Sequence, residues 1–179
     1  MGQPMSNNLT EYGEPQNGQP RANDLDVAWL AGIFDGEGCL AAQWVNGTQE
    51  HVALHWRVGN TDSDLLDKVQ RIVLSVAGRK YPISLHDDSG VHFCYRIDVT
   101  NQRGVELLCQ ATLPYLTSKR EQAEAVIRFC ESRRLHRHKN TGYSPEERGL
   151  VADMKRLKRC NLVPTNRGVE SKRETPTAA

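Results

Sequence analysis

The most informative stretch of the sequence is Trp29-Leu30-Ala31-Gly32-Ile33-Phe34-Asp35-Gly36-Glu37-Gly38. The Asn and Asp residues at positions 23–26 can cap a helix, which we expect to run from about Val27 to Asp35. Small residues recur four apart along that helix, at Ala28, Gly32 and Gly36. One face of the helix is therefore nearly bare, and the backbone of a second helix can approach it closely.

The end of this stretch also matches a different pattern. Gly36-Glu37-Gly38-Cys39-Leu40-Ala41 has the spacing of the dinucleotide fingerprint G-x-G-x-x-G/A. That fingerprint follows a strand and opens a helix, so that a phosphate meets the helix N-terminus. Here a helix precedes the pattern and a strand follows it, which argues against a dinucleotide-binding fold.

Outward from this stretch, the chain repeats one arrangement of predicted elements. Two strands follow the first helix, and the second of them alternates apolar and polar residues over 51–58. A helix capped by Thr61 and ended by Gly78 comes next. The second round has strands at 79–86 and 91–99, a turn between them at 86–90, and a helix from about Arg103 to Leu113.

Two capping-box patterns open further helices near the C-terminus. Ser118–Glu121 opens a helix to about Arg134, and Ser144–Glu147 opens another to about Cys160. The predicted fold is therefore α+β in the order αββαββα, with antiparallel sheets and two extra C-terminal helices. We expect one domain at residues 25–160, between a disordered N-terminal tail at 1–24 and a basic, flexible C-terminal tail at 161–179.

Composition narrows the class of protein further. The chain has 179 residues and five cysteines, and none of the cysteines forms a C-x-x-C pair. This argues against a disulfide framework and a thiolate zinc site. No signal peptide or membrane span is apparent, so we expect a soluble, intracellular protein.

The net charge of +1 hides an asymmetry along the chain. Residues 1–115 carry a net charge of −6, whereas residues 116–179 carry +7. A basic C-terminal third suggests a polyanionic partner, although a solvated helix face has the same pattern.

Residues 30–38 closely resemble the nine-residue signature of the LAGLIDADG homing endonucleases. Five positions are identical, and Ile33, Phe34, Gly36 and Glu37 are conservative replacements. In that family the signature is a helix that leads into a strand of an αββαββα fold, and the resemblance covers about residues 25–160. It implies a site-specific endonuclease of intron homing, whose antiparallel sheets form a saddle on double-stranded DNA. Two half-sites would make a pseudo-palindromic target of about 20 base pairs.

Glu37 is the candidate metal ligand, because a carboxylate near the partly negative C-terminal end of a helix can attract a divalent cation. The family usually has Asp here, and members with one signature form homodimers. The resemblance therefore implies a twofold partner that packs on Ala28, Ala31, Gly32 and Asp35. It also implies two or three Mg²⁺ ions shared by the two subunits and held by Glu37 and the Gly36 carbonyl. Ca²⁺ should support binding without cleavage.

Two more positions match the family's catalytic pattern. Asn60 ends the second strand, where the family has a polar residue that organises water or metal. Lys119 corresponds to a lysine that the family directs into the catalytic pocket. Without the family, Asn60 is a turn residue and Lys119 a surface lysine.

The strand pattern predicts which side chains face the DNA. By parity, Gln43, His55, Arg57 and Arg96 share the face away from the core, and Gln and Arg can bind adenine and guanine edges. Strand 79–86 has no clear polar face. We expect the C-terminal basic residues to contact phosphates, namely Arg133, Arg134, Arg137, Lys139, Lys155, Arg156, Lys158 and Arg159.

Two other functions stay open at this point. An RNA maturase of this fold would bind intron RNA and assist its splicing. A DNA-binding regulator would bind duplex without cutting it. The host compartment is also open between a bacterial cytoplasm, a chloroplast and a mitochondrion.

Overall fold

The computed structural model describes residues 22–45, 51–87, 93–136 and 142–160. Its elements in chain order are α1 (Asp24–Glu37), β1 (Gly38–Trp44), β2 (Val52–Asn60), α2 (Ser63–Ala77), β3 (Ile83–Asp87), β4 (Phe93–Val99), α3 (Gln102–Thr112), the 3₁₀ helix η2 (Leu113–Tyr115), α4 (Arg120–His136) and α5 (Pro145–Cys160). This order confirms the predicted αββαββα fold with two further C-terminal helices.

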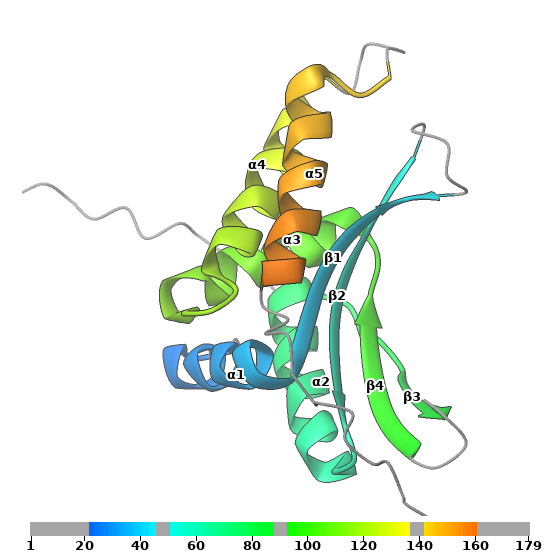
Figure 1. Cartoon of the computed structure of the whole chain (residues 1–179). Helices are drawn as coiled ribbons and strands as arrows, with labels where there is room; N and C mark the ends of the chain where they lie inside the picture. Colours follow the sequence, from blue (N-terminus) through cyan, green and yellow to red (C-terminus); the bar gives the residue numbers. More distant parts are fainter. Residues whose placement is uncertain (1–21, 46–50, 88–92, 137–141, 161–179) are drawn as a thin grey trace, which may run out of the picture.

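The strands form a four-stranded sheet in the order β1-β2-β4-β3. All three pairs of neighbours are antiparallel. Figure 1 shows that the sheet is curved and that the helices gather on one side of it, while the opposite face carries no helix. We call this uncovered side the outer face.

The core lies between the helices and the inner face of the sheet. Phe34 of α1 stacks on Trp56 of β2 with the ring centroids 4.6 Å apart, and both side chains are fully buried. A Cβ at Gly38 would collide with the ring and the carbonyl oxygen of Phe34. Glycine is therefore required at Gly38, where the chain passes from α1 into β1.

The structure corrects several predicted boundaries. Helix α1 runs to Glu37 and not only to about Asp35, so Glu37 is the last residue of the helix. Asp62 caps α2 in place of Thr61, because its carboxylate accepts hydrogen bonds from the backbone of Asp64 and Leu65. Strand β3 begins only at Ile83, since the chain turns after the left-handed Gly78 that ends α2.

The two C-terminal helices begin in different ways. At α5 the predicted capping box forms, with Ser144 and Glu147 bonded to each other's backbone N–H groups. At α4 the helix starts at Arg120, and the cap comes from Asp35 of α1. None of the described helices combines the length and apolar composition that a membrane span requires.

Candidate active site

A hollow of about 600 Å³ opens on the outer face where α1 ends. Its lining residues are Glu37, Cys39, Arg57, Gly59, Asn60, Thr61, Cys94 and Arg96. The fold therefore brings together two of the three predicted catalytic residues and two of the predicted reading residues. They come from α1, β2 and β4, which are far apart in sequence.

Glu37 lies at the mouth of this hollow with an exposed side chain. As the last residue of α1, it sits beside backbone carbonyls that have no partner within the helix, including that of Gly36. A carboxylate and carbonyl oxygens are the ligands that Mg²⁺ and Ca²⁺ prefer. The donor set at the end of α1 thus fits a hard divalent cation.

Asn60 ends β2 and has a local structural contact. Its side-chain oxygen accepts a hydrogen bond from the backbone N–H of Asp62 at 2.9 Å. One end of the amide therefore shapes the turn into α2, as a turn residue would. Asn60 also lines the hollow, so both interpretations of this residue stay compatible with its position.

Lys119 contacts the C-terminal end of α1. Its Nζ donates to the backbone carbonyl of Asp35 at 2.6 Å, in a helix whose last turn holds no basic residue of its own. The cation thus complements the helix dipole from outside the helix. Burial lowers the pKa of Lys119, and the negative charges of Asp35 and Glu37 act in the opposite direction.

Asp35 is the residue that ties α1 to α4. Its carboxylate accepts backbone hydrogen bonds from Thr117 at 2.6 Å, Ser118 at 3.2 Å and Lys119 at 3.0 Å. These N–H groups precede the first turn of α4 and have no helical partners. Burial alone would raise the pKa of Asp35, but the hydrogen bonds outweigh it and hold the pKa below its usual value.

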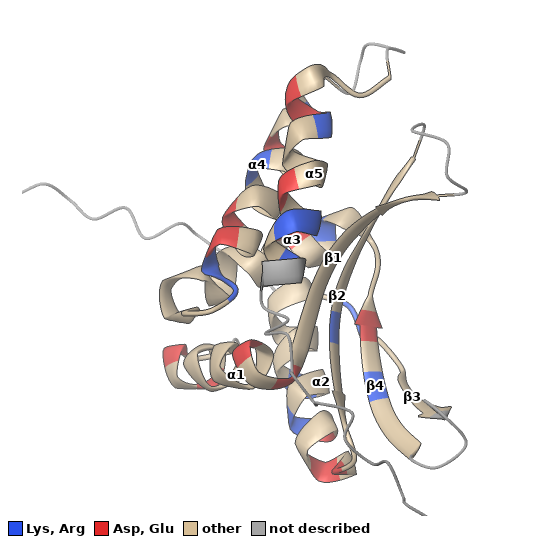
Figure 2. Ribbon diagram, viewed as in Figure 1, with Lys and Arg blue, Asp and Glu red and all other residues tan. Residues whose placement is uncertain are grey.

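The four predicted reading residues share the outer face, as parity requires. Gln43 and His55 lie close together, with Nε2 of the two side chains 3.2 Å apart. Burial, followed by the charge of Arg57, lowers the pKa of His55, so its ring is neutral at neutral pH. Figure 2 shows basic positions on β2 and β4 beside an acidic position on β4, for which the sequence predicts no role. That residue is Asp98, which pairs with both Arg57 and Arg96.

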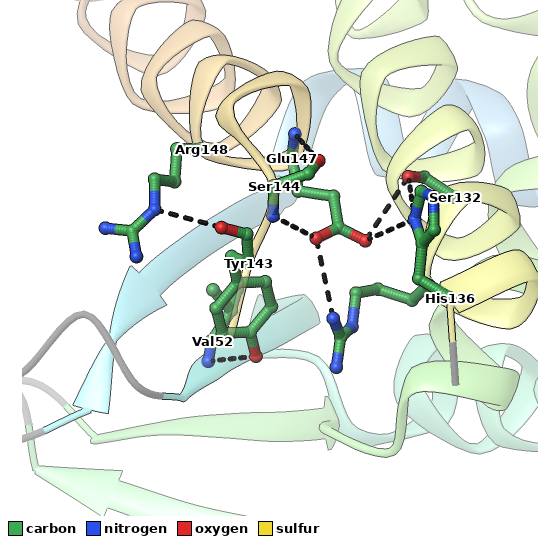
Figure 3. Close-up of polar contacts among 8 residues, drawn as sticks. Val52, Ser132, His136, Tyr143, Ser144, Glu147 and Arg148 are labelled. Carbon is green, nitrogen blue, oxygen red and sulfur yellow. Dashed lines mark hydrogen bonds and ion pairs between the residues drawn. The ribbon is translucent and has the colours of Figure 1, made fainter. Parts of the chain in front are cut away.

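Two of the predicted phosphate contacts, Arg133 and Arg134, have partners within the chain. Arg134 pairs with Glu106, whose side chain is 2% exposed. Arg133 donates to the fully buried Glu147, which also accepts from Ser132 and the Ser144 backbone (Figure 3). These arginines neutralise buried carboxylates, which would be costly unpaired. Arg137 and Lys139 lie outside the described residues.

Comparison with known proteins shows which proteins the chain is similar to. No protein-family profile matches the chain. The DNA endonuclease I-CvuI of Chlorella vulgaris is 30% identical over 115 residues, which are 61% of this chain and 66% of that protein. A crystal structure of the homing endonuclease I-CvuI with its target superposes with a TM-score of 0.57 and 22% identity, covering 75% of this chain and 82% of that one. The LAGLIDADG meganuclease I-AabMI matches with a TM-score of 0.50 and 19% identity, over 72% of this chain and 43% of that one.

The chain belongs to the LAGLIDADG homing endonuclease family. Its signature helix α1 presents two glycines to the outside. A Cβ at Gly32 or Gly36 would meet no atom within 4 Å in the described part of the chain. Leu25 on the same helix is 82% exposed. The fold of a single chain therefore does not explain why this LAGLIDADG helix carries glycine at these positions.

The four residues predicted for the dimer interface differ in how accessible they are within one chain. Ala31 is fully buried in the core of its own chain, so its side chain faces away from any partner. The carboxylate of Asp35 is bonded to the start of α4 within the same chain. Ala28 is partly exposed and Gly32 is exposed, and these two stay available on the signature helix.

The described part of one chain offers few ligands for a metal ion at this site. Within the described ranges, no group of three or more His, Cys, Asp or Glu side chains is placed to hold a metal ion. Among the residues that line the hollow, Glu37 is the one carboxylate. A single carboxylate is a weak site for a divalent cation.

Proposed function

We propose that this protein is a site-specific endonuclease that hydrolyses double-stranded DNA at a long pseudo-palindromic target. The observation that carries the proposal is the hollow that joins Glu37 to Arg57 and Arg96. It lies on the face of the sheet that carries no helix, where a duplex has room to dock. Membership of the family supports the same activity, and one structure of I-CvuI is a complex with its target.

We further propose that the protein acts as a homodimer. Two copies packed through the exposed glycines of α1 would bring two Glu37 side chains together at the ends of the two helices. Two carboxylates in contact repel each other unless a cation lies between them. The pair would thus complete the metal site that one chain lacks.

The cation would be Mg²⁺, in two or three sites shared by the subunits. Bound Mg²⁺ supplies charge neutralisation at the scissile phosphate and helps to activate water. The Glu37 carboxylate and the Gly36 carbonyl would hold it at the end of α1. Asn60 would orient water from the floor of the hollow, and Lys119 would keep the end of α1 in place beside the phosphate through its bond to the Asp35 carbonyl.

Substitution of Glu37 tests the mechanism. We expect Glu37→Gln to retain DNA binding, because the reading face is unchanged, and to lose cleavage at least about 100-fold, because the metal ligand is gone. The assay is cleavage of a randomised duplex library with Mg²⁺, with Ca²⁺ as the metal control and sequencing of the cut ends. Glu131→Gln, on the exposed surface of α4, is the matched control variant.

The same assay separates the alternatives. Cutting at one site of about 20 base pairs, with Mg²⁺ and not Ca²⁺, would support the endonuclease. Retention of one duplex without cutting would favour a regulator. A protein that neither cuts nor retains any duplex would favour a maturase that binds intron RNA. A Glu37→Gln variant that cuts at the wild-type rate would remove Glu37 from the mechanism. A protein with a homing role would act in a bacterial cytoplasm, a chloroplast or a mitochondrion.

A further inference from the structure

We propose that Asp98 is a positioning residue that holds Arg57 and Arg96 as a pair for reading guanine near the cut. The inference rests on the proposed DNA-cleaving function. Asp98 places a carboxylate on a surface that should bind a polyanion. Because such a charge repels phosphate, its presence there needs a reason.

The register of the sheet puts the three side chains on one face. Arg57 of β2 is the cross-strand partner of Asp98 of β4, and Arg96 lies two residues before Asp98 on the same strand. Residues two apart on a strand, and residues directly opposite across a pair, point to the same side. All three therefore project from the outer face.

Asp98 uses one carboxylate oxygen for each arginine. Nε of Arg57 donates a hydrogen bond to Oδ1, whereas Nε of Arg96 forms an ion pair with Oδ2 at 2.7 Å without hydrogen-bond geometry. Both contacts involve Nε, and the described residues provide no hydrogen-bond partner for the Nη atoms of either arginine. The terminal amino groups thus stay available for a ligand.

Partial burial makes this pairing stiffer than an ordinary surface ion pair. The side chains of Arg57, Arg96 and Asp98 are 34%, 20% and 25% exposed, respectively. Partly buried charges are screened less by salt, and packing restricts their rotamers. A guanidinium with a fixed plane can bind O6 and N7 of guanine together, whereas a mobile one more readily finds a phosphate.

The position of the cluster predicts which bases it reads. Arg57 is opposite Cys39, close to the end of α1, and both arginines line the hollow that contains Glu37. Gln43 lies four residues farther along β1, which corresponds to about 13 Å or about four base pairs. The arginine pair should therefore read the inner base pairs of each half-site, and Gln43 and His55 the outer ones.

The test compares base preference and salt dependence in Asp98→Asn and the wild-type protein. The asparagine has almost the same size but no charge, so the arginines lose their fixed orientation. We expect preference for the inner guanines to fall about tenfold, while preference at the outer positions stays unchanged. Binding to unrelated duplex should tighten, and the slope of log K against log salt should become steeper by about 1 to 2, as freed arginines contact phosphates.

The control is Asp67→Asn on the exposed surface of α2, a helix on the side of the sheet opposite to the outer face. It should change neither the base preference nor the salt slope. If Asp98 only ties β2 to β4, Asp98→Asn will lose affinity for all duplexes equally as its thermal stability falls, and the inference is then wrong. Asp98→Thr, which suits a strand, repeats the test should the asparagine variant not fold.

Experiment can reject the role of Asp98 without rejecting the proposed DNA cleavage. A wild-type protein that neither binds nor cuts any duplex would overturn the proposed function and this inference with it. A wild-type protein that cuts a defined site, together with an Asp98→Asn variant of unchanged preference and salt slope, would overturn the inference alone.

Discussion

Asp35 lies near the end of the signature helix, yet its carboxylate serves the start of another helix. It accepts three backbone hydrogen bonds from residues 117–119, more than 80 positions away in sequence. A cap of this kind is formed by a residue that no local pattern around α4 reveals. Because the same segment carries Lys119, Asp35 also sets the position of a predicted catalytic side chain.

Substitution of Asp35 should therefore destabilise the protein in a pH-dependent way. We expect Asp35→Asn to lower the free energy of unfolding by about 1–2 kcal/mol at neutral pH, as loss of a helix cap does. The folded-state pKa lies below the ordinary aspartate value of 3.8. The stabilisation is thus fully present above that value and is lost as the pH falls through the lower folded-state pKa.

Urea denaturation of both proteins at neutral pH and near pH 3 measures this difference. Asp67→Asn, an exposed residue of α2, is the control and should behave as the wild type. A difference of the same size at both pH values would show that the charge of Asp35 does not matter. The cap would then be held by the shape of the side chain alone.

At the scale of an element, α1 carries two glycines that its own chain does not need. Glycine in a helix interior costs about 0.5–1 kcal/mol relative to alanine. Neither Gly32 nor Gly36 has a neighbour that a methyl group would strike in the described part of the chain. This cost is understandable if a second copy of α1 packs on that face.

Replacement of Gly32 by alanine separates the two effects. We expect Gly32→Ala to raise the free energy of unfolding of the isolated chain by about 0.5–1 kcal/mol and to weaken the homodimer. Denaturation at low protein concentration measures the first effect, and sedimentation velocity measures the second. Gly149→Ala in α5, another exposed helical glycine with open space for a Cβ, should stabilise the chain equally without changing assembly. A Gly32→Ala variant that dimerises as the wild type does would place the interface elsewhere.

At the scale of the whole molecule, one chain supplies one carboxylate and one curved sheet. A twofold axis between two copies of α1 would double both, which gives a complete metal site and two half-site readers. The described structure is thus half of the enzyme that we propose.

This arrangement predicts mass and substrate requirements together. In sedimentation equilibrium the protein should have twice the 20.1 kDa mass of the chain. Cleavage should require both half-sites, so a duplex with one half-site of about 10 base pairs should bind weakly and stay uncut. A protein that sediments as a monomer with and without DNA, and still cuts, would contradict the shared site.

Local patterns in the sequence determined the order of the elements and part of the candidate site. The order of elements, the outer face with Gln43, His55, Arg57 and Arg96, and the position of Glu37 at a helix end follow from periods of two and about 3.6 and from capping residues. These depend on residues close in sequence, whose geometry is nearly independent of the rest of the chain. The nine-residue signature is also a local pattern, and its residues indicated the family.

Only the tertiary structure decided which distant groups meet. In the folded chain, Ala31 is buried in the core, and the carboxylate of Asp35 bonds to the start of α4. Asp98 lies between two arginines of the outer face. Such contacts depend on how helices cross and on which strands become neighbours. Those are set by packing of the whole core, and side chains such as Asp35 and Asp98 carry no local mark of the partner that the packing will bring to them.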